Sequence, residues 1–456
     1  MKTGAGSGRS PVNATGTPSD PFAVLRSRSY LRLLALAAIL GVPISAVALG
    51  FLQLVAFLQR WLFVDLPKAL GFPGEPLWWP LPLLAVAGVV VGLTIRYLPG
   101  RGGHSPADGL ETGGAPSPVE LPGIVLAALA TLSLGAVLGP EAPLIALGGG
   151  LAGCAVRLAQ RGRRSGTNAR AEAMAGVAGS FAAISTLLGS PILGAFLLME
   201  MAGVAGPTLG IVLVPGLLAA GVGSLIFVGL SAWTGLGAVS LSIPDLPRVG
   251  QPDLAQFGWA IGIGLAAAGL GSAIRWLALF LRPHVERRPI TITPVVGLAV
   301  GALAVAFAAA TGANSSQVLF SGQTALGPLL AGGARYAVWA LALLVACKGL
   351  AYGASMSGFR GGPVFPSMFL GAAGGIALSH LHGLPMVPAA GMGIGAMGAV
   401  MLRLPMTSVL LATLLLLSDG LATMPLVIVA VVVAYVASAR LVPRPPSDAH
   451  TGARAP

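Results

Sequence analysis

The stretch LGPEAP, residues 138–143, and the stretch GFRGGPVFP, residues 358–366, each interrupt a long apolar run with glycine and proline. A Gly-Pro pair in such a run ends one helix and begins another, because proline is tolerated at the first helical position. The start of the new helix presents free N–H groups and a partial positive charge. In lipid, such backbone must be buried in protein or line a polar cavity. We therefore expect two broken helices that start inside the membrane.

The apolar runs around these breaks indicate an all-α integral membrane protein. Of the 456 residues, 55% are hydrophobic and 9% are charged, whereas a soluble domain carries about 25% charged residues. A membrane-spanning helix needs about 20 apolar residues. Several charge-free stretches, such as 201–244, exceed that length, and 142–156 is too short to cross alone. This composition excludes a secreted disulfide scaffold, a disordered protein and an ordinary cytosolic enzyme.

The formal net charge of +12 comes mostly from arginines between apolar runs and near the ends of the chain. One group lies between Arg157 and Arg170, and another, from Arg9 to Arg32, precedes the first apolar run. The positive-inside rule places both groups in the cytoplasm. We therefore expect a multi-pass protein of the plasma (inner) membrane with both termini cytoplasmic. Nucleic acid is not an expected partner, because aromatic and basic residues do not interleave.

The chain divides into two halves of similar design. We expect a disordered cytoplasmic tail at residues 1–28, a first membrane half at 29–244, a second at 245–442 and a disordered cytoplasmic tail at 443–456. The polar connector IPDLPRVGQPD, residues 243–253, separates the halves, and each half holds one break. Interrupted segments at corresponding positions of two halves are the best sequence indication of a transporter binding site. The pattern therefore predicts an inverted repeat with broken and re-entrant helices.

The first break contains a carboxylate, Glu141, with charge-free sequence on both sides. Two helix starts that meet in mid-membrane would form an anion site, because each offers free N–H groups. An intramembrane carboxylate suggests a functional site. Glu141 would compete with a permeating anion for the same place and would leave when protonated, which makes it a candidate gate. The alternative is a carboxylate that caps its own helix.

Two further segments carry candidate site residues. Glu200 is a second lone carboxylate, at the end of SPILGAFLLME; it is either a structural residue at a helix junction or part of a proton path. In Gly103-His104-Ser105-Pro106, Ser105 could donate a hydroxyl to an anion and His104 could donate or titrate. The alternative for Ser105 is an N-cap before Pro106, opening a short helix that ends near Thr112.

Five motifs in order resemble those of the CLC family of chloride channels and chloride–proton antiporters. They are GHSPA (103–107) for the family's GSGIP, GPEAP (139–143) for G(K/R)EGP, GGPVFP (361–366) for GxFxP, SPILG…ME (190–200) for NAPLAG…EE, and RLPMT (403–407) for RAPLT. The resemblance covers essentially the whole membrane part. It implies the CLC-type inverted repeat and a homodimer with one pore per subunit. It also implies that chloride or another small anion is carried and, in an exchanger, protons.

The resemblance also implies roles for individual residues. Glu141 matches the gating glutamate. Ser105, or His104 if the alignment shifts by one, matches the chloride-coordinating serine, and the amides of Val364 and Phe365 match the second half of the anion site. The glycines and prolines that form the breaks are Gly103, Gly139, Pro140, Gly362, Pro363 and Pro366.

The sequence departs from the family pattern in three places. Pro140 and Pro363 have no N–H, so the anion-binding amides must come from Glu141, Ala142, Val364 and Phe365. The family's exchangers often carry two glutamates where this chain has Glu200-Met201, and methionine cannot carry a proton. The coordinating tyrosine of the last helix would fall at 442–446, where none occurs, and Tyr435 lies too early.

Several functions remain open on the sequence alone. Proton-coupled exchange and passive conduction are equally compatible with Glu141. A different secondary transporter, of organic anions or Na⁺-coupled solutes, would share the broken helices but would need more intramembrane ligands. An intramembrane enzyme would have to use Ser355 with His380 or His382, and no cofactor or metal site is expected, since no His-Glu-x-x-His or Walker motif occurs. Fluoride exporters of the family usually carry methionine in the first motif, so His104-Ser105 favours chloride.

Overall fold

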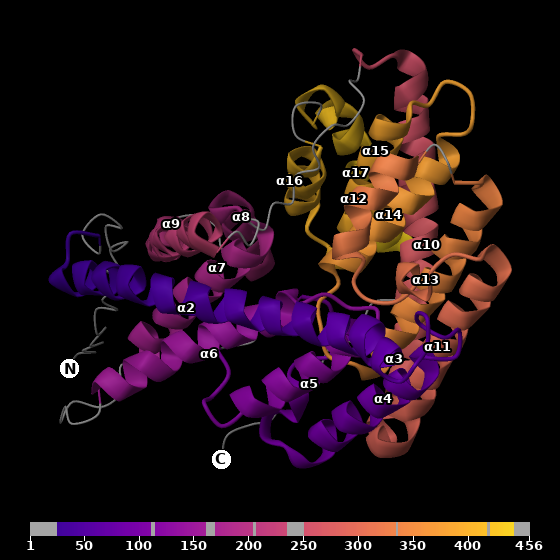
Figure 1. Ribbon diagram of the computed structural model, residues 1–456. Helices are drawn as coiled ribbons and strands as arrows, with labels where there is room; N and C mark the ends of the chain where they lie inside the picture. The colour runs from indigo at the N-terminus through magenta and orange to yellow at the C-terminus, as the bar shows by residue number, and fades with distance from the viewer. Residues whose placement is uncertain are drawn as a thin grey trace, which may run out of the picture.

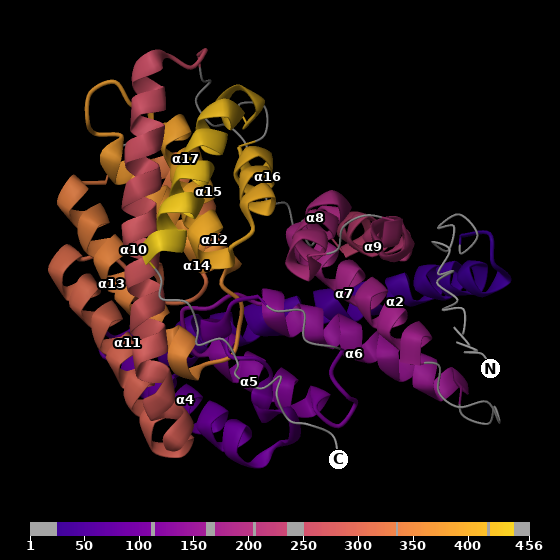
Figure 2. The same cartoon turned by 180° about the vertical axis from the view of Figure 1, so that it is seen from behind.

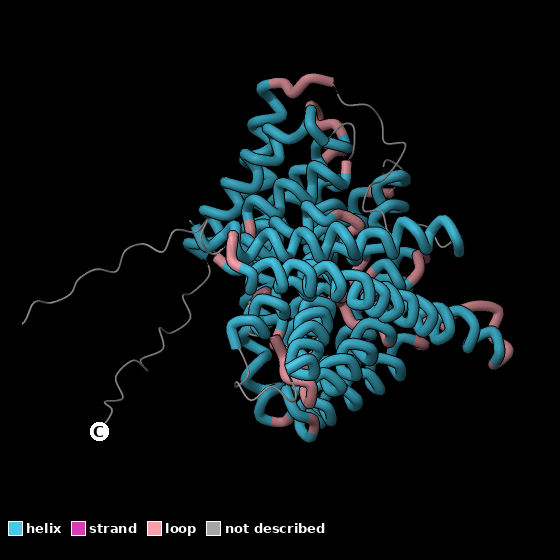
Figure 3. Tube along the Cα trace, turned by 90° about the vertical axis from the view of Figure 1, so that its left-hand side faces the viewer, coloured by secondary structure: helices cyan, strands magenta, loops and turns pink. Residues whose placement is uncertain are grey.

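The computed structural model describes residues 25–110, 115–160, 169–203, 207–234, 250–333, 336–416 and 420–441. Within these residues the chain is a set of helices joined by short loops (Figure 3). Nine of the described helical segments are long and apolar enough to cross a membrane. The predicted all-α membrane class is confirmed. Residues 1–24 of the first predicted tail, the whole of the second, most of the connector and the 442–446 segment lie outside the described residues.

The two halves contain these elements in chain order. The first half comprises α2 (Arg28–Arg60), η1 (Trp61–Asp65), α3 (Leu66–Ala69), α4 (Pro80–Tyr97), η2 (Pro99–Gly102), η3 (Pro106–Asp108), α5 (Leu121–Ser133), α6 (Glu141–Gln160), α7 (Ala169–Leu188), α8 (Pro191–Ala202) and α9 (Pro207–Thr234). The second half comprises α10 (Leu254–Arg287), α11 (Pro289–Thr311), η4 (Ser315–Gln317), α12 (Gln323–Gly332), α13 (Val338–Gly358), α14 (Val364–Leu378), α15 (Met386–Leu402), α16 (Pro405–Leu415) and α17 (Gly420–Leu441).

Local sequence signals account for several helix starts. The Ser190 side chain accepts a hydrogen bond from the N–H of Leu193 at the start of α8, and Asp253 accepts one from Gln256 at the start of α10. Such caps satisfy N–H groups that have no partner within the helix. One length prediction was wrong. The helix expected to be too short at 142–156 is the 20-residue α6, which extends beyond this stretch at both ends and includes Arg157, ion-paired with Glu172 on α7.

The helices of the two halves pack in the same pattern, as an inverted repeat requires (Figures 1 and 2). In the first half α2 contacts α9, α6 contacts α7, and α8 contacts α7. In the second half the corresponding pairs are α10 with α17, α14 with α15, and α16 with α15. Two further contacts, α4 with α11 and α8 with α16, join corresponding helices of opposite halves. The predicted inverted repeat is therefore confirmed.

Glycine pairs bring the broken helices close to their neighbours. A Cβ added to Gly148 on α6 would strike the backbone of Gly179 on α7, and one added to Gly371 on α14 would strike the backbone of Gly393 on α15. Small residues allow helix backbones in a membrane to approach closely and gain van der Waals contact. The two glycines stand at the same place in the repeat, each seven residues after the first residue of its helix. This packing fixes the starts of α6 and α14.

Candidate functional site

The two breaks meet and pair with each other. The Gly139 N–H donates to the carbonyl of Gly362 at 2.8 Å, and the Gly362 N–H donates to the carbonyl of Gly139 at 2.6 Å. The helices that follow begin at Glu141 and Val364. Two helix N-termini, one from each half, are thereby fixed side by side within the protein. Free N–H groups and the positive ends of both helix dipoles then act on one small region.

Glu141 places its carboxylate at the start of the other half's helix. Its Oε1 accepts a hydrogen bond of 2.9 Å from the N–H of Phe365, and the residue is completely buried. The second oxygen, Oε2, is buried without a hydrogen-bond partner. The side chain thus reaches across the break to α14. A carboxylate on a helix N-terminus occupies the position that a free anion would take there.

Two glycines leave the space that this carboxylate fills. A Cβ added to Gly139 or to Gly362 would collide with the Glu141 carboxyl group. Besides interrupting the helices, the two glycines leave room for the Glu141 side chain where the two breaks meet.

The first motif has a geometry that its sequence does not predict. Ser105 precedes the short 3₁₀ helix η3, but its hydroxyl does not cap that helix; Oγ is buried and has no hydrogen-bond partner. The capping alternative is therefore wrong for this residue. Thr112 lies outside the described residues, and Gly109 at φ 94° follows η3 directly. The lack of a partner for the Ser105 hydroxyl favours the other interpretation, in which this hydroxyl donates to a ligand.

His104 and Ser105 face different cavities. Ser105 lines a cavity of about 780 Å³ rich in arginine. His104 lines a second cavity, also of about 780 Å³ and more apolar, together with Ala142 at the start of α6. Arg360 lines both cavities. The two neighbouring residues thus border different cavities and are not interchangeable in space.

Glu200 binds the start of a helix in the opposite half. Its Oε1 accepts the N–H of Met406 at 2.9 Å, and its Oε2 accepts both the N–H and the hydroxyl of Thr407 at 2.7 Å. These donors belong to the first turn of α16, where an acidic group also complements the helix dipole. The contacts favour the structural alternative for Glu200. The proton-path alternative stays a prediction.

We expect Glu200→Gln to lower stability by about 1–2 kcal/mol, because an amide supplies one acceptor oxygen where the carboxylate supplies two. Thermal unfolding of the detergent-solubilised variant measures this loss. Proton flux in liposomes should stay at the wild-type ratio to anion flux. A variant of normal stability with lost proton flux would instead assign Glu200 to a proton path.

The structure adds one residue that the motif analysis missed, Tyr352, and gives Ser355 a different role from the one weighed on the sequence. The hydroxyl of the fully buried Tyr352 on α13 donates to the carbonyl of Pro363 at 3.0 Å. The hydroxyl of Ser355 accepts a hydrogen bond of 3.1 Å from the N–H of Val137, the residue just before the first break. Ser355 is therefore engaged in supporting the junction, and no hydrogen bond joins it to His380 in the described part of the chain. Tyr352 belongs to no recognisable sequence motif, so only the fold reveals its contact with Pro363.

The fold and the junction define a class: helical membrane transport proteins built from an inverted repeat with an anion-compatible site between broken helices. A family model described as "Voltage gated chloride channel" matches residues 85–439. The chain belongs to this family, the CLC family. It is 31% identical over 375 residues to the putative ion-transport protein YfeO of Salmonella paratyphi A, a match that covers 80% of this chain and 84% of that protein.

Solved structures share the fold. A slow cyanobacterial Cl⁻/H⁺ antiporter superposes with a TM-score of 0.71 at 20% identity, over 90% of this chain and 95% of that chain. A CLC-type fluoride/proton antiporter superposes with a TM-score of 0.66 at 20% identity, over 90% of this chain and 96% of that chain. At this identity the likeness shows a shared architecture and assigns no role to individual residues of this chain.

Proposed function

We propose that this protein moves chloride, or another small anion, across the plasma membrane along a path that Glu141 closes, as a proton-coupled antiporter or as a passive channel. The observation that carries the proposal is the Glu141 carboxylate held on the Phe365 amide. When the carboxylate is charged, it competes with an anion for the helix start. When it takes a proton, it loses that attraction, and an anion can replace it.

Similar proteins support the same reading. The two solved neighbours named above are a Cl⁻/H⁺ and a fluoride/proton antiporter. In this chain, the site is built from backbone amides, which hold an anion without a full positive charge beside Glu141 and so allow its release. Under the proposal the protein is a homodimer with one path per subunit, and both termini are cytoplasmic.

The test uses purified protein in chloride-loaded liposomes. A potassium ionophore releases the membrane potential, and external chloride and pH are recorded together. Chloride efflux with opposing proton uptake identifies an exchanger. Chloride efflux without proton movement identifies a channel or uncoupled carrier in which Glu141 serves only as a gate. If no small anion leaves the liposomes faster than from protein-free controls, the proposal is wrong.

We expect Gly362→Ala to hold the gate open. The added Cβ would collide with the Glu141 carboxyl group. Such overpacking costs about 1–3 kcal/mol, which lowers the occupancy of the Phe365 amide by roughly fivefold to 150-fold. Anion flux should persist or rise, and proton flux per anion should fall. The matched control is Gly374→Ala on α14, where a Cβ meets nothing within 4 Å; equal effects in both variants would contradict the gate geometry.

A further inference from the structure

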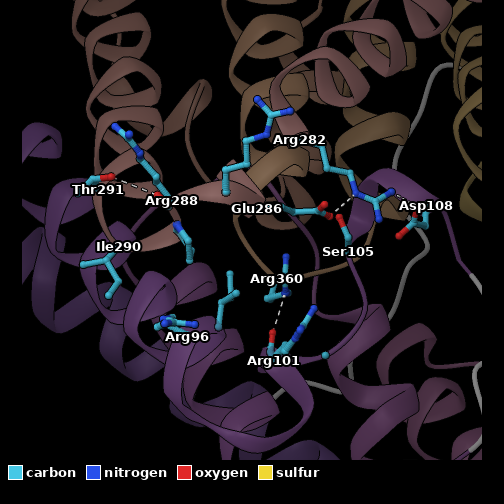
Figure 4. A pocket seen from close by; sticks show the side chains of 14 residues that line it. Arg96, Arg101, Ser105, Asp108, Arg282, Glu286, Arg288, Ile290, Thr291 and Arg360 are labelled. Atoms are coloured by element: carbon cyan, nitrogen blue, oxygen red, sulfur yellow. Dashed lines mark hydrogen bonds and ion pairs between the residues drawn. The ribbon is translucent and has the colours of Figure 1, made fainter. Parts of the chain in front are cut away.

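Arginine is the most frequent residue in the lining of the cavity that Ser105 borders. Its guanidinium groups come from both halves of the chain: the end of α4, η2, the end of α10, the turn after it, and the loop before α14. We call this cavity the arginine basin, after the residues Arg96, Arg101, Arg282, Arg287, Arg288 and Arg360 (Figure 4). Asp108 and Glu286 are the acidic residues that line it. Six guanidinium groups against two carboxylates leave a formal charge of +4.

Most of this charge is not neutralised by the protein. Arg282 forms ion pairs with both Asp108 and Glu286. The five other arginines of the basin make no ion pair with a described residue. Grouped like charges repel one another and cost stability. A bound anion would relieve this repulsion.

Hydrogen bonds hold Arg360 in place in one wall of the basin. Arg360 is partly buried, and its Nε donates to the carbonyl of Arg101 at 3.3 Å while its backbone N–H donates to the hydroxyl of Thr131 at 3.1 Å. Ser105 faces the same space with a buried hydroxyl that has no partner (Figure 4). Two residues beyond Arg360 the chain reaches Gly362 and the Glu141 junction. The basin therefore lies at one mouth of the proposed path.

The size and chemistry of the basin indicate the ligand. A volume of about 780 Å³ lies in the range of small-molecule sites, about 300–1,000 Å³, and far exceeds one halide ion. Guanidinium groups bind phosphate oxygens in pairs and with defined geometry. No aromatic side chain lines the basin, and arginine is its most frequent lining residue. The basin therefore fits best a compact multivalent anion that carries two or more phosphate charges.

We propose that the arginine basin binds a phosphate group of a multivalent anion, and that this ligand blocks anion entry to the path from that side. The positive-inside rule assigns the basin to the cytoplasmic face. The ligand is a free oligophosphate or the headgroup of an anionic lipid, since both present the same phosphate chemistry. The blocking step rests on the proposed anion transport, whereas the binding step does not.

Binding is measured first, without transport. Purified protein in detergent is titrated with pyrophosphate by calorimetry in chloride buffer at about 0.15 M ionic strength, where surface charges are screened beyond about 8 Å. We expect saturable binding that Arg360→Gln weakens at least about tenfold, the effect of one charge-assisted contact. Arg440→Gln at the end of α17 removes an exposed positive charge outside the basin and should leave binding unchanged.

Two results would overturn the binding site: no saturable binding of pyrophosphate to the wild type, or equal weakening in Arg360→Gln and Arg440→Gln. If Arg360→Gln does not fold, Arg288→Gln replaces it, because Arg288 is exposed at the turn between α10 and α11 and its side chain caps neither helix. That variant is held to the same tenfold expectation.

Liposomes then separate block from transport and identify the source of phosphate. Pyrophosphate added to the basin side should slow anion flux in the wild type and not in Arg360→Gln. Slowing in phosphatidic acid vesicles, relative to phosphatidylcholine vesicles and without pyrophosphate, supports a lipid headgroup; slowing only by pyrophosphate supports a free ligand. If pyrophosphate binds but the protein carries no anion flux, the proposed function is wrong and the phosphate-binding site stands. Anion flux that pyrophosphate and phosphatidic acid both leave unchanged overturns the block.

Discussion

In Glu141→Gln we expect coupled proton movement to fall to the leak of protein-free liposomes while anion flux persists. Glutamine has nearly the shape of glutamate, and its amide oxygen can still accept the N–H of Phe365, which Glu141 Oε1 accepts at 2.9 Å. It has no charge to compete with the anion and no proton to release. The variant therefore separates the two proposed tasks of this side chain. Simultaneous records of chloride and pH in liposomes measure both.

The matched control is Glu200→Gln, which makes the same chemical change at the other lone carboxylate of the apolar sequence. Glu200 holds the first turn of α16 through three hydrogen bonds, so its loss should affect stability and leave the proton-to-anion ratio intact. If the wild type proves to be a passive channel, Glu141→Gln should instead remove the pH dependence of its anion conductance. Unchanged proton coupling, or an unchanged pH dependence, would refute the gate assignment.

The meeting of the two breaks could be predicted from the sequence because glycine and proline leave a local signal. A helix start inside an apolar run has N–H groups that need a partner. In this fold the backbone of Gly139 forms two hydrogen bonds with the backbone of Gly362. The carboxylate of Glu141 follows directly from that geometry. The helix start, the charge and the apolar surroundings of Glu141 all lie within a few residues of one another, so a short stretch of sequence is enough to predict its place.

Other parts of the site depend on contacts that leave no local signal. The sequence places Ser105 before Pro106, as an N-cap would be, yet the residue lines the arginine basin and its hydroxyl is buried without a hydrogen-bond partner. Gly103, at φ 94°, turns the chain just before it, and the direction of that turn is set by packing. Arg360 is visible in the sequence of the second break. Its proposed role depends on arginines from distant segments that line the same cavity.

The second large effect is expected at Lys348, which is fully buried on α13 without a carboxylate partner in the described residues. Its Nζ donates to the carbonyls of Gln317, Val318 and Leu319 at 3.0 Å and lies 3.3 Å from that of Phe320. The ammonium group also lies 4.5 Å from the ring centre of Phe369 on α14. It therefore binds the turn that follows η4 to the core of the second half.

This turn supports the candidate site. Phe320 has a positive φ of 59°, a conformation that costs energy for a residue other than glycine and persists only where surrounding contacts hold it. The Phe320 N–H donates to the carbonyl of Gly135 at 3.2 Å, a few residues before the break at Gly139. Lys348 thus connects α13 to the segment that leads into Glu141. No sequence motif marks this contact, because all its acceptors are backbone carbonyls.

We expect Lys348→Met to lower stability by at least roughly 3 kcal/mol, since each buried carbonyl left without a partner costs about 1–3 kcal/mol and methionine fills the space but donates nothing. Thermal unfolding in detergent compares it with Lys68→Met, the same change at an exposed lysine of α3, where we expect a shift within about 0.5 kcal/mol. Equal stability of the two variants would show that the ammonium does not hold the turn. Because the turn leads to the break, partly folded Lys348→Met protein should also lose anion flux, whereas Lys68→Met should keep it.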